Sequence, residues 1–287
     1  MKVSLIMPAH NEEKTIMNTL NSILNQTKIP EEIIIVEDNS TDKTFKILKQ
    51  YQKKNKKIKI IQVKNKNISK NRNMAIKESK GNIMVCVDAG CILDKNYIKK
   101  IIVPFNNKNI NFVGAISKLN TKTLFDKCFA SFVVKEKASK NYLPKGHAMA
   151  FTKGAWKEVG GFPENLALGA EDTYFGRKMS EMGNKPVIVK DAIVYWETRS
   201  NLKTIFRQFK SYGYWDGRAF SFSKLPKNSK LNMFVSVIFP ITILHSGYKG
   251  IKLFLKFKSL KAFFYGIGID LVKIYGYFFG LIRGRLK

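Results

Sequence analysis

The sequence is poor in cysteine, in histidine and in acidic residues. Its 287 residues include three cysteines and three histidines, and 21 Asp and Glu stand against 51 Lys and Arg. Cys86, Cys91 and Cys128 have no metal-binding spacing and form no paired framework, which argues against a zinc module or a disulfide scaffold and favours a reducing compartment. The formal net charge of +30 favours an anionic partner, although lysine mixed with Asn and Ile also fits a compositional habit of the source.

Other features are missing as well. We find no internal repeat and no recognised nucleic-acid module, and the basic residues are dispersed, so we expect no nucleic-acid partner. The N-terminal residues MKVSLIMPAHNEE are not expected to form a signal peptide, because their apolar run is short and polar residues follow at once. What the chain does have is 45% hydrophobic residues, enough for a substantial core at this length.

The N-terminal part of the chain alternates short apolar runs with helical periodicity. The β-branched runs predict strands at Val3–Met7, Ile33–Val36, Ile58–Val63, Ile83–Val87 and Phe112–Ile116. Ser69 is the expected N-cap of the third intervening helix, and Gly81 its left-handed C-cap. Strands that alternate with helices predict an α/β fold with a doubly wound, mostly parallel sheet covered by helices.

Acids and amides follow three of the predicted strands, in the segments PAHNEE, EDNSTD and DAGC. In an open α/β sheet, ligands bind outside the carboxyl ends of the strands, so Glu12, Asp38 and Asp88 are expected to converge on one crevice. Any one of these acids alone would be read as a loop residue or a helix cap. Acids at equivalent positions after three strands favour a binding site.

These segments resemble motifs of the family 2 glycosyltransferases, which have the GT-A fold. The resemblance is carried, in order, by SLIMPAHNEE, IIIVEDNSTDKT, SKNRNMAIKESKGNIMVCVDAGC and GGFPENLALGAEDTYFGRKMSEMG. It implies a nucleotide-sugar donor, a divalent cation and inversion at the anomeric carbon of the sugar. The same resemblance implies that Asp38 contacts the base, that Pro8 and Glu12 lie near the nucleoside, and that Arg72 approaches the diphosphate. A positive charge there would stabilise the diphosphate as it leaves.

The expected metal site departs from the family pattern. Where the family usually has Asp-x-Asp, this chain has Asp88-Ala89-Gly90, so the second acid is missing. A hard cation can take further oxygen ligands from water and phosphate, so Asp88 stays the candidate ligand for Mg²⁺ or Mn²⁺, with the strictness of metal dependence left open. Cys91 is not expected to be a ligand, because thiolates suit softer ions.

Glu171 and Asp172 begin a predicted helix. Acids at a helix N-terminus can have a purely structural role, because the helix dipole favours negative charge at that end. The resemblance instead implies that Asp172 is the catalytic base and that Glu171 shapes the site. His147 is a candidate in the acceptor loop. Arg207, on a predicted helix with basic and aromatic stripes that also includes Arg199, is a candidate for contact with phosphate or a membrane surface; an ordinary amphipathic surface helix is the alternative.

The C-terminal part carries two apolar stretches. Leu231–Tyr248 lacks charged residues, and Ala262–Ile282 is interrupted by Asp270 and Lys273. A membrane-spanning helix needs about 20 apolar residues, and charges in hydrocarbon are costly. Two spans, or a helical hairpin lying in one leaflet, fit equally well. Both imply membrane attachment, with a soluble helical layer as the alternative.

The sequence therefore predicts a donor-binding half at residues 1–117, an acceptor-binding and catalytic half at 118–224, and membrane-associated helices at 225–287. The predicted enzyme is an inverting glycosyltransferase. It would move a sugar from a nucleotide-diphosphate donor to a hydroxyl of a glycan or lipid-linked acceptor in cell-surface glycan or glycolipid assembly, with its catalytic domain in the cytoplasm. Two alternatives stay open: a polyprenyl-phosphate sugar synthase, and an inactive membrane-bound nucleotide- or anion-binding protein, which Gly90 in place of an acid would favour.

Overall fold

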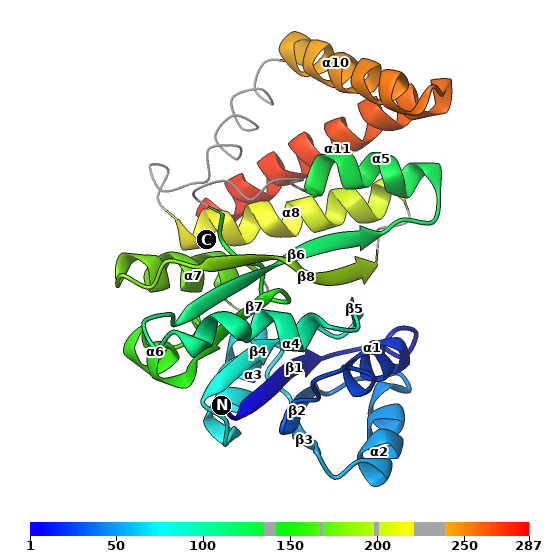
Figure 1. Ribbon diagram of the computed structural model, residues 1–287. Helices are drawn as coiled ribbons and strands as arrows, with labels where there is room; N and C mark the ends of the chain where they lie inside the picture. The colour runs from blue at the N-terminus through cyan, green and yellow to red at the C-terminus, as the bar shows by residue number, and fades with distance from the viewer. Residues whose placement is uncertain (135–141, 167–168, 198–200, 221–238, 287) are drawn as a thin grey trace. The chain divides into compact units, whose positions relative to one another are not determined.

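The computed structural model describes residues 1–134, 142–166, 169–197, 201–220 and 239–286. The chain divides into two compact units, Met1–Lys118 with Lys137–Trp196 and Leu119–Glu136 with Glu197–Lys287. The first unit contains most of the sheet, and the second consists mainly of long helices (Figure 1). The boundaries expected after residues 117 and 224 stay a prediction.

An eight-stranded sheet has the order β3-β2-β1-β4-β7-β6-β8-β5. Its strands are β1 (Val3–Ala9), β2 (Glu32–Asp38), β3 (Ile58–Val63), β4 (Ile83–Cys86), β5 (Cys91–Leu93), β6 (Phe112–Asn120), β7 (Met149–Thr152) and β8 (Val187–Glu197). The four neighbouring strands β3, β2, β1 and β4 are parallel to one another, and β7 pairs antiparallel with both β4 and β6. The α/β class with a parallel, helix-flanked core is confirmed. The sequence pattern did not predict β5, β7 or β8.

Helices of the first unit cover both faces of this sheet. They are α1 (Ile16–Leu24), α2 (Thr44–Lys54), α3 (Ile68–Glu78), α4 (Tyr97–Ile101), α6 (Lys153–Glu158) and α7 (Glu171–Glu181), with a 3-10 turn η1 (Val103–Asn106). Alternate residues of β1 enter different cores: Leu5 and Met7 pack in one apolar cluster, and Ile6 in the other. A sheet buried on both faces explains why its parallel strands are continuous apolar runs.

Two predicted features of α3 are wrong. The N-cap is Asn67, whose side chain accepts a hydrogen bond from an amide of the first turn, whereas Ser69 lies inside the helix and donates to the carbonyl of Leu166 at 2.9 Å. Gly81 does not have a left-handed conformation. Glycine is favoured at this position because there is no space for a side chain: a Cβ would lie 2.9 Å from the carbonyl oxygen of Lys2.

The second unit contains α5 (Leu124–Val133), α8 (Leu202–Ala219), α10 (Phe239–Phe257) and α11 (Leu260–Arg285). Within this unit, α11 packs along α8, and α10 packs on α11 (Figure 1). Gly276, Gly280 and Gly284 recur at every fourth residue of α11, and each approaches a backbone carbonyl of α8 so closely that a side chain would clash. Gly213 and Gly217 of α8 meet the backbone of α11 in the same way. Glycine on both helices therefore allows backbone-to-backbone packing.

Among the described residues, α11 is the helix long and apolar enough to cross a membrane by length and composition, and 44% of its most apolar window is buried inside the protein. Of the other predicted apolar stretch, residues 231–238 lie outside the described residues and the rest belongs to α10. Between the two apolar stretches the sequence has a lysine-rich segment, Lys249–Lys261, which forms the second half of α10, the turn after it and the start of α11.

Candidate active site

The sheet order places the ends of β2, β1 and β4 next to one another. Asp38 is the last residue of β2, Pro8 lies near the end of β1, and Asp88 follows β4. Glu12 lies in the loop that leaves β1. The acids predicted to share one edge of the sheet therefore do follow adjacent parallel strands.

The carboxylate of Asp38 is almost fully buried and is engaged inside the protein. Its Oδ1 accepts a hydrogen bond from the amide of Asn65 at 2.9 Å. Its Oδ2 accepts from Nδ2 of Asn71 at 2.8 Å and from the amide of Asn67 at 3.4 Å. Asp38 therefore fixes the loop between β3 and α3, a structural task that the sequence did not predict.

The loops after β1 and β2 are joined by side chains that the sequence reading did not single out. Nδ1 of His10 lies 2.7 Å from the carbonyl oxygen of Asp38, and Oδ1 of Asn11 accepts from the amide of Thr41 at 2.8 Å. The amide of Glu12 donates to Oγ1 of Thr44 at 2.7 Å. These contacts make the strand-end region one connected surface.

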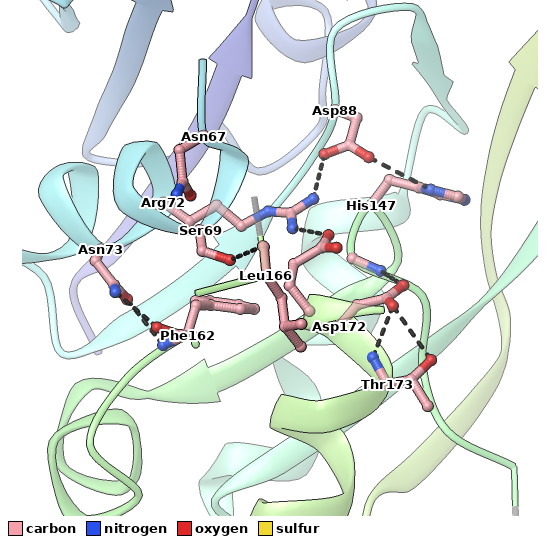
Figure 2. A network of polar contacts seen from close by, with 12 residues as sticks. Asn67, Ser69, Arg72, Asn73, Asp88, His147, Phe162, Leu166, Asp172 and Thr173 are labelled. Atoms are coloured by element: carbon pink, nitrogen blue, oxygen red, sulfur yellow. Dashed lines mark hydrogen bonds and ion pairs between the residues drawn. The ribbon is translucent and has the colours of Figure 1, made fainter. Parts of the chain in front are cut away.

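Arg72 lies at the centre of the site (Figure 2). Its Nη2 is 2.7 Å from Oδ1 of Asp88, and its Nη1 is 2.6 Å from Oε1 of Glu171. The guanidinium carbon lies 5.4 Å from the ring centroid of Phe162. Gly146 covers the group closely, since a Cβ at that residue would lie 2.6 Å from Nη2. The side chain is only 1% exposed, so Arg72 joins two acids from inside the protein.

The charges of this cluster support one another. Burial alone would lower the pKa of Arg72, but Asp88 and Glu171 hold it above its ordinary value. Burial would raise the pKa of Asp88, yet the charge of Arg72 and the neighbouring His147 hold it well below its usual range. The pKa of Glu171 is raised by burial and by the adjacent Asp172. Arg72 and Asp88 therefore remain charged at neutral pH.

Asp172 is the second residue of α7 and is half-buried. Its Oδ2 accepts a hydrogen bond from the amide of Gly146 at 2.9 Å, and its Oδ1 accepts from the amide of Thr173 at 2.6 Å. Figure 2 shows Asp172 and Thr173 on the same side of the network. Backbone and neighbouring donors thus fix the orientation of a carboxylate that is still partly accessible.

His147 extends the network beyond Asp88. Its Nδ1 lies 3.7 Å from Oδ2 of Asp88, and its Nε2 lies 2.7 Å from Oγ of Ser117. The centroid of its ring is 6.2 Å from that of Trp196. His147 is therefore part of this charged cluster. Arg207 lies exposed on α8 of the second unit, and Arg199 lies outside the described residues.

Helix α3 also holds the segment that leads to α7. The side-chain amide of Asn73 donates to the carbonyl of Phe162 at 2.9 Å, and its oxygen accepts the amide of the same residue at 2.9 Å. Ser69 bonds the carbonyl of Leu166 (Figure 2). The sequence did not single out Asn73 and gave Ser69 the wrong role of a helix cap, although polar side chains spaced along one buried helix face were a usable signal.

Gly90 is required by the backbone. Its φ is +93°, and its amide donates to Oγ1 of Thr19 at 3.0 Å. A Cβ at Gly90 would lie 3.3 Å from Oε2 of Glu12, which also accepts a hydrogen bond from the hydroxyl of Thr15. The carboxylate of Glu12 therefore lies beside the position where the family pattern would have a second acid.

The described residues contain no group of three or more His, Cys, Asp and Glu side chains placed to hold a metal ion. Oδ1 of Asp88 is bound to Arg72, and Oδ2 faces His147. Burial raises the pKa of Cys91, which makes a thiolate ligand unfavourable. The protein side of a cation site here would thus be a single carboxylate. That fits a hard cation only if phosphate or water supplies the other oxygens.

A parallel α/β sheet with charged side chains gathered at its strand ends is the arrangement of an enzyme that binds its ligand at a switch point. Residues 4–151, just over half of the chain, match the model of the family described as Glycosyl transferase family 2. This protein belongs to glycosyl transferase family 2, and the predicted class of enzyme, a nucleotide-sugar glycosyltransferase, is confirmed.

Relatives and solved structures agree with this assignment. Glycosyltransferase AglE of Haloferax volcanii is 24% identical over 216 residues, which span 72% of this chain and 71% of AglE. TarS of Staphylococcus aureus, a poly(ribitol-phosphate) beta-N-acetylglucosaminyltransferase, is 35% identical over 102 residues, 34% of this chain but only 18% of TarS.

The structure of TarS residues 1–349 with UDP aligns over 98% of this chain and 90% of that one, with a TM-score of 0.56 and 20% identity. The mannosyltransferase PcManGT of Pyrobaculum calidifontis, solved with GDP-Man and Mn²⁺, aligns over 96% of this chain and 87% of its own, with a TM-score of 0.64 and 18% identity. These likenesses confirm the predicted GT-A fold.

Proposed function

We propose that this protein transfers a sugar from a nucleotide-diphosphate donor to a hydroxyl group, with inversion at the anomeric carbon. The observation that carries the proposal is the network in which Arg72 joins Asp88, after β4, to Glu171, beside Asp172. A donor-side acid and a candidate base thereby belong to one preorganised constellation.

The donor nucleotide is proposed to bind at the ends of β1 and β2, where Pro8, Glu12 and Asp38 lie. Because Asp38 already anchors the loop before α3, a base would meet a prearranged surface rather than a mobile loop. Preorganisation of this kind lowers the entropic cost of ligand binding.

In the proposed reaction, the acceptor hydroxyl oxygen bonds to the anomeric carbon as the bond from that carbon to the diphosphate oxygen breaks. The electron pair leaves with the diphosphate, and Asp172 takes the hydroxyl proton. The amides of Gly146 and Thr173 keep the carboxylate oriented for this transfer. Arg72 contributes a fixed positive charge, and Glu171 holds that guanidinium in position.

A divalent cation, Mg²⁺ or Mn²⁺, is proposed to be held by Asp88 together with phosphate oxygens of the donor. When bound, it would offset the negative charge of the leaving diphosphate. His147, next to Asp88, is proposed to contact the acceptor or a phosphate. Contact of Arg207 with the acceptor or a phosphate stays a prediction.

The acceptor is proposed to be a glycan or a lipid-linked glycan of the cell surface, reached by a catalytic unit on the cytoplasmic side of a membrane. Support comes from relatives whose names describe glycan assembly, among them TarS and the O-antigen chain rhamnosyltransferase RfbN of Salmonella typhimurium. The apolar helix α11 supports membrane association.

A donor screen tests the proposal. The purified protein is incubated with a panel of nucleotide sugars, and release of nucleoside diphosphate is measured with and without lipid extract. Asp38→Ala and Asp88→Ala should each weaken nucleoside diphosphate binding in calorimetry, whereas Asp191→Ala, at an exposed acid of the same unit, should not. Unchanged affinity in both site variants, with no release from any donor, would overturn the proposal.

A further inference from the structure

Helix α10 presents a continuous apolar face to the solvent. The outer face of α10 consists of Ile241, Leu244, Tyr248, Ile251 and Leu255, which are between 41% and 74% exposed. Their spacing of three and four residues places them on one side of the helix. Thr242, Ser246 and Leu253, on the opposite side, are buried. The helix is thus amphipathic, with its apolar side turned away from α11.

Positive charge borders this face. Lys252, Lys256, Lys258 and Lys261 are exposed, and the sequence contains no Asp or Glu from residue 217 to residue 269. The ammonium of Lys252 lies 4.6 Å from the ring centroid of Tyr248, so its apolar stem runs along the outer face. Apolar side chains flanked by lysines are complementary to an anionic lipid surface, where each basic residue adds about 1 kcal/mol.

The two charges that interrupt α11 do not face outward. Oδ2 of Asp270 accepts a hydrogen bond from Ser246 at 3.0 Å and lies 3.6 Å from Nε2 of His245, both on α10. The ammonium of Lys273 lies 4.7 Å from the ring centroid of Phe132. The contacts of Asp270 join α11 to α10, and the contact of Lys273 joins α11 to α5, so both charges have partners inside the helical unit and need none in lipid.

The packing of α8 argues against a membrane span by α11. The glycines of α11 hold its backbone directly against that of α8 over several turns, so both helices would have to enter hydrocarbon together. Exposed charges on α8, at Lys203, Arg207 and Arg218, would enter with them. Each would cost about 3 kcal/mol on insertion scales, which opposes such an insertion.

We propose that the outer face of α10 binds the surface of an anionic membrane leaflet, while α11 stays packed on α8 and crosses no membrane. The inference deepens the membrane association of the proposed function and rests on it. It selects the in-plane hairpin from the two arrangements that the sequence left open.

Flotation of the full chain with lipid vesicles tests the surface. Vesicles of phosphatidylcholine mixed with phosphatidylglycerol should bind the protein, and vesicles of phosphatidylcholine alone should bind it at least about tenfold more weakly. The double variant Leu244→Ser/Leu255→Ser should lose about tenfold in affinity. Lys252→Gln/Lys258→Gln should lose a similar factor, on the anionic vesicles only.

The matched control is Met17→Ser/Val103→Ser, two residues of the first unit that are 49% and 55% exposed. It should bind vesicles as the unchanged protein does. Equal binding by the α10 variants would overturn the proposal, and so would loss of self-association by these variants without any change in vesicle binding, since a second copy would then cover the face. No sugar donor is present, so the result does not depend on transfer activity, which the donor screen measures separately.

Labelling in intact cells tests the absence of a span. Lys261→Cys and Leu286→Cys place reporter thiols near the two ends of α11, at exposed positions. A membrane-impermeant maleimide added outside should label neither position, and both should react after lysis. Label at either position in intact cells would show that α11 or α10 crosses the membrane and would overturn the proposal.

Discussion

Arg72 and Asp88 form a salt bridge between the middle of α3 and the end of β4, with 2.7 Å between Nη2 and Oδ1. The same guanidinium binds Glu171 at the start of α7. One buried side chain therefore fixes the distance between the strand end that would hold the donor and the helix that carries the candidate base. The expectation that Arg72 approaches the diphosphate stays a prediction, but its direct partners are these two acids.

Removing this charge should cost much of the stability. Arg72→Met leaves the buried Glu171 and the half-buried Asp88 without their cation, and the free energy of unfolding should fall by about 3–5 kcal/mol. Arg72→Lys keeps the charge but not the two-pronged geometry, so its free energy of unfolding should lie between those of the unchanged protein and Arg72→Met. Lys59→Met, which breaks the exposed pair with Glu78, is the control and should change little. Urea unfolding followed by circular dichroism measures all three, and a similar small loss in every variant would contradict the role of Arg72.

The role of Asp172 can be separated from folding. Asp172→Asn removes the base and keeps one of the two hydrogen bonds from the amides of Gly146 and Thr173, because its NH2 group cannot accept the other; kcat should fall about 10²- to 10⁴-fold with donor affinity unchanged. Glu181→Gln, at the other end of α7, should keep full activity. Full activity of Asp172→Asn would favour an acceptor that is already ionised, such as a polyprenyl phosphate.

The single-carboxylate cation site makes a prediction at Gly90. Gly90→Ala and Gly90→Asp should each lower the free energy of unfolding by about 1–2 kcal/mol, because φ at this residue is +93°. Gly90→Asp adds a carboxylate next to Glu12 and should bind Mn²⁺ more tightly than Gly90→Ala in calorimetry with nucleoside diphosphate. Equal affinities would mean that the cation is not held at this strand end.

The cysteines should be unreactive in the native protein. Burial raises the pKa of Cys86 to about 12 and that of Cys128 to about 11, and raises that of Cys91 well above its ordinary value. Because only the thiolate reacts, and thiolate forms only as the pH approaches these raised values, alkylation should stay slow at pH 8. Mass spectrometry after iodoacetamide treatment, with urea-unfolded protein as the control, measures this. A rapidly modified Cys91 would reveal an accessible thiol beside the site.

The sequence by itself determined the local structure of the first unit and the positions of its acids. The continuous run Ile33–Val36 reflects a strand buried on both faces, and the spacing of Ile16, Leu20 and Ile23 reflects a helix buried on one face, so both patterns are encoded in neighbouring residues. The motifs that identified the family are local too. The alternation of strands with helices predicted a mostly parallel sheet with the acids at its strand ends, whereas the strand order, in which β1 separates the strands that precede Asp38 and Asp88, came from the tertiary structure.

Only the tertiary structure decided what these residues touch. Arg72 and Glu171 are 99 residues apart in the chain, and no periodicity relates them. The same holds for Asn73, which positions the segment before α7, and for Asp270, which accepts a hydrogen bond from Ser246 of α10. The physical reason is that such contacts depend on how separate elements pack, and packing is set by the whole core rather than by any one segment.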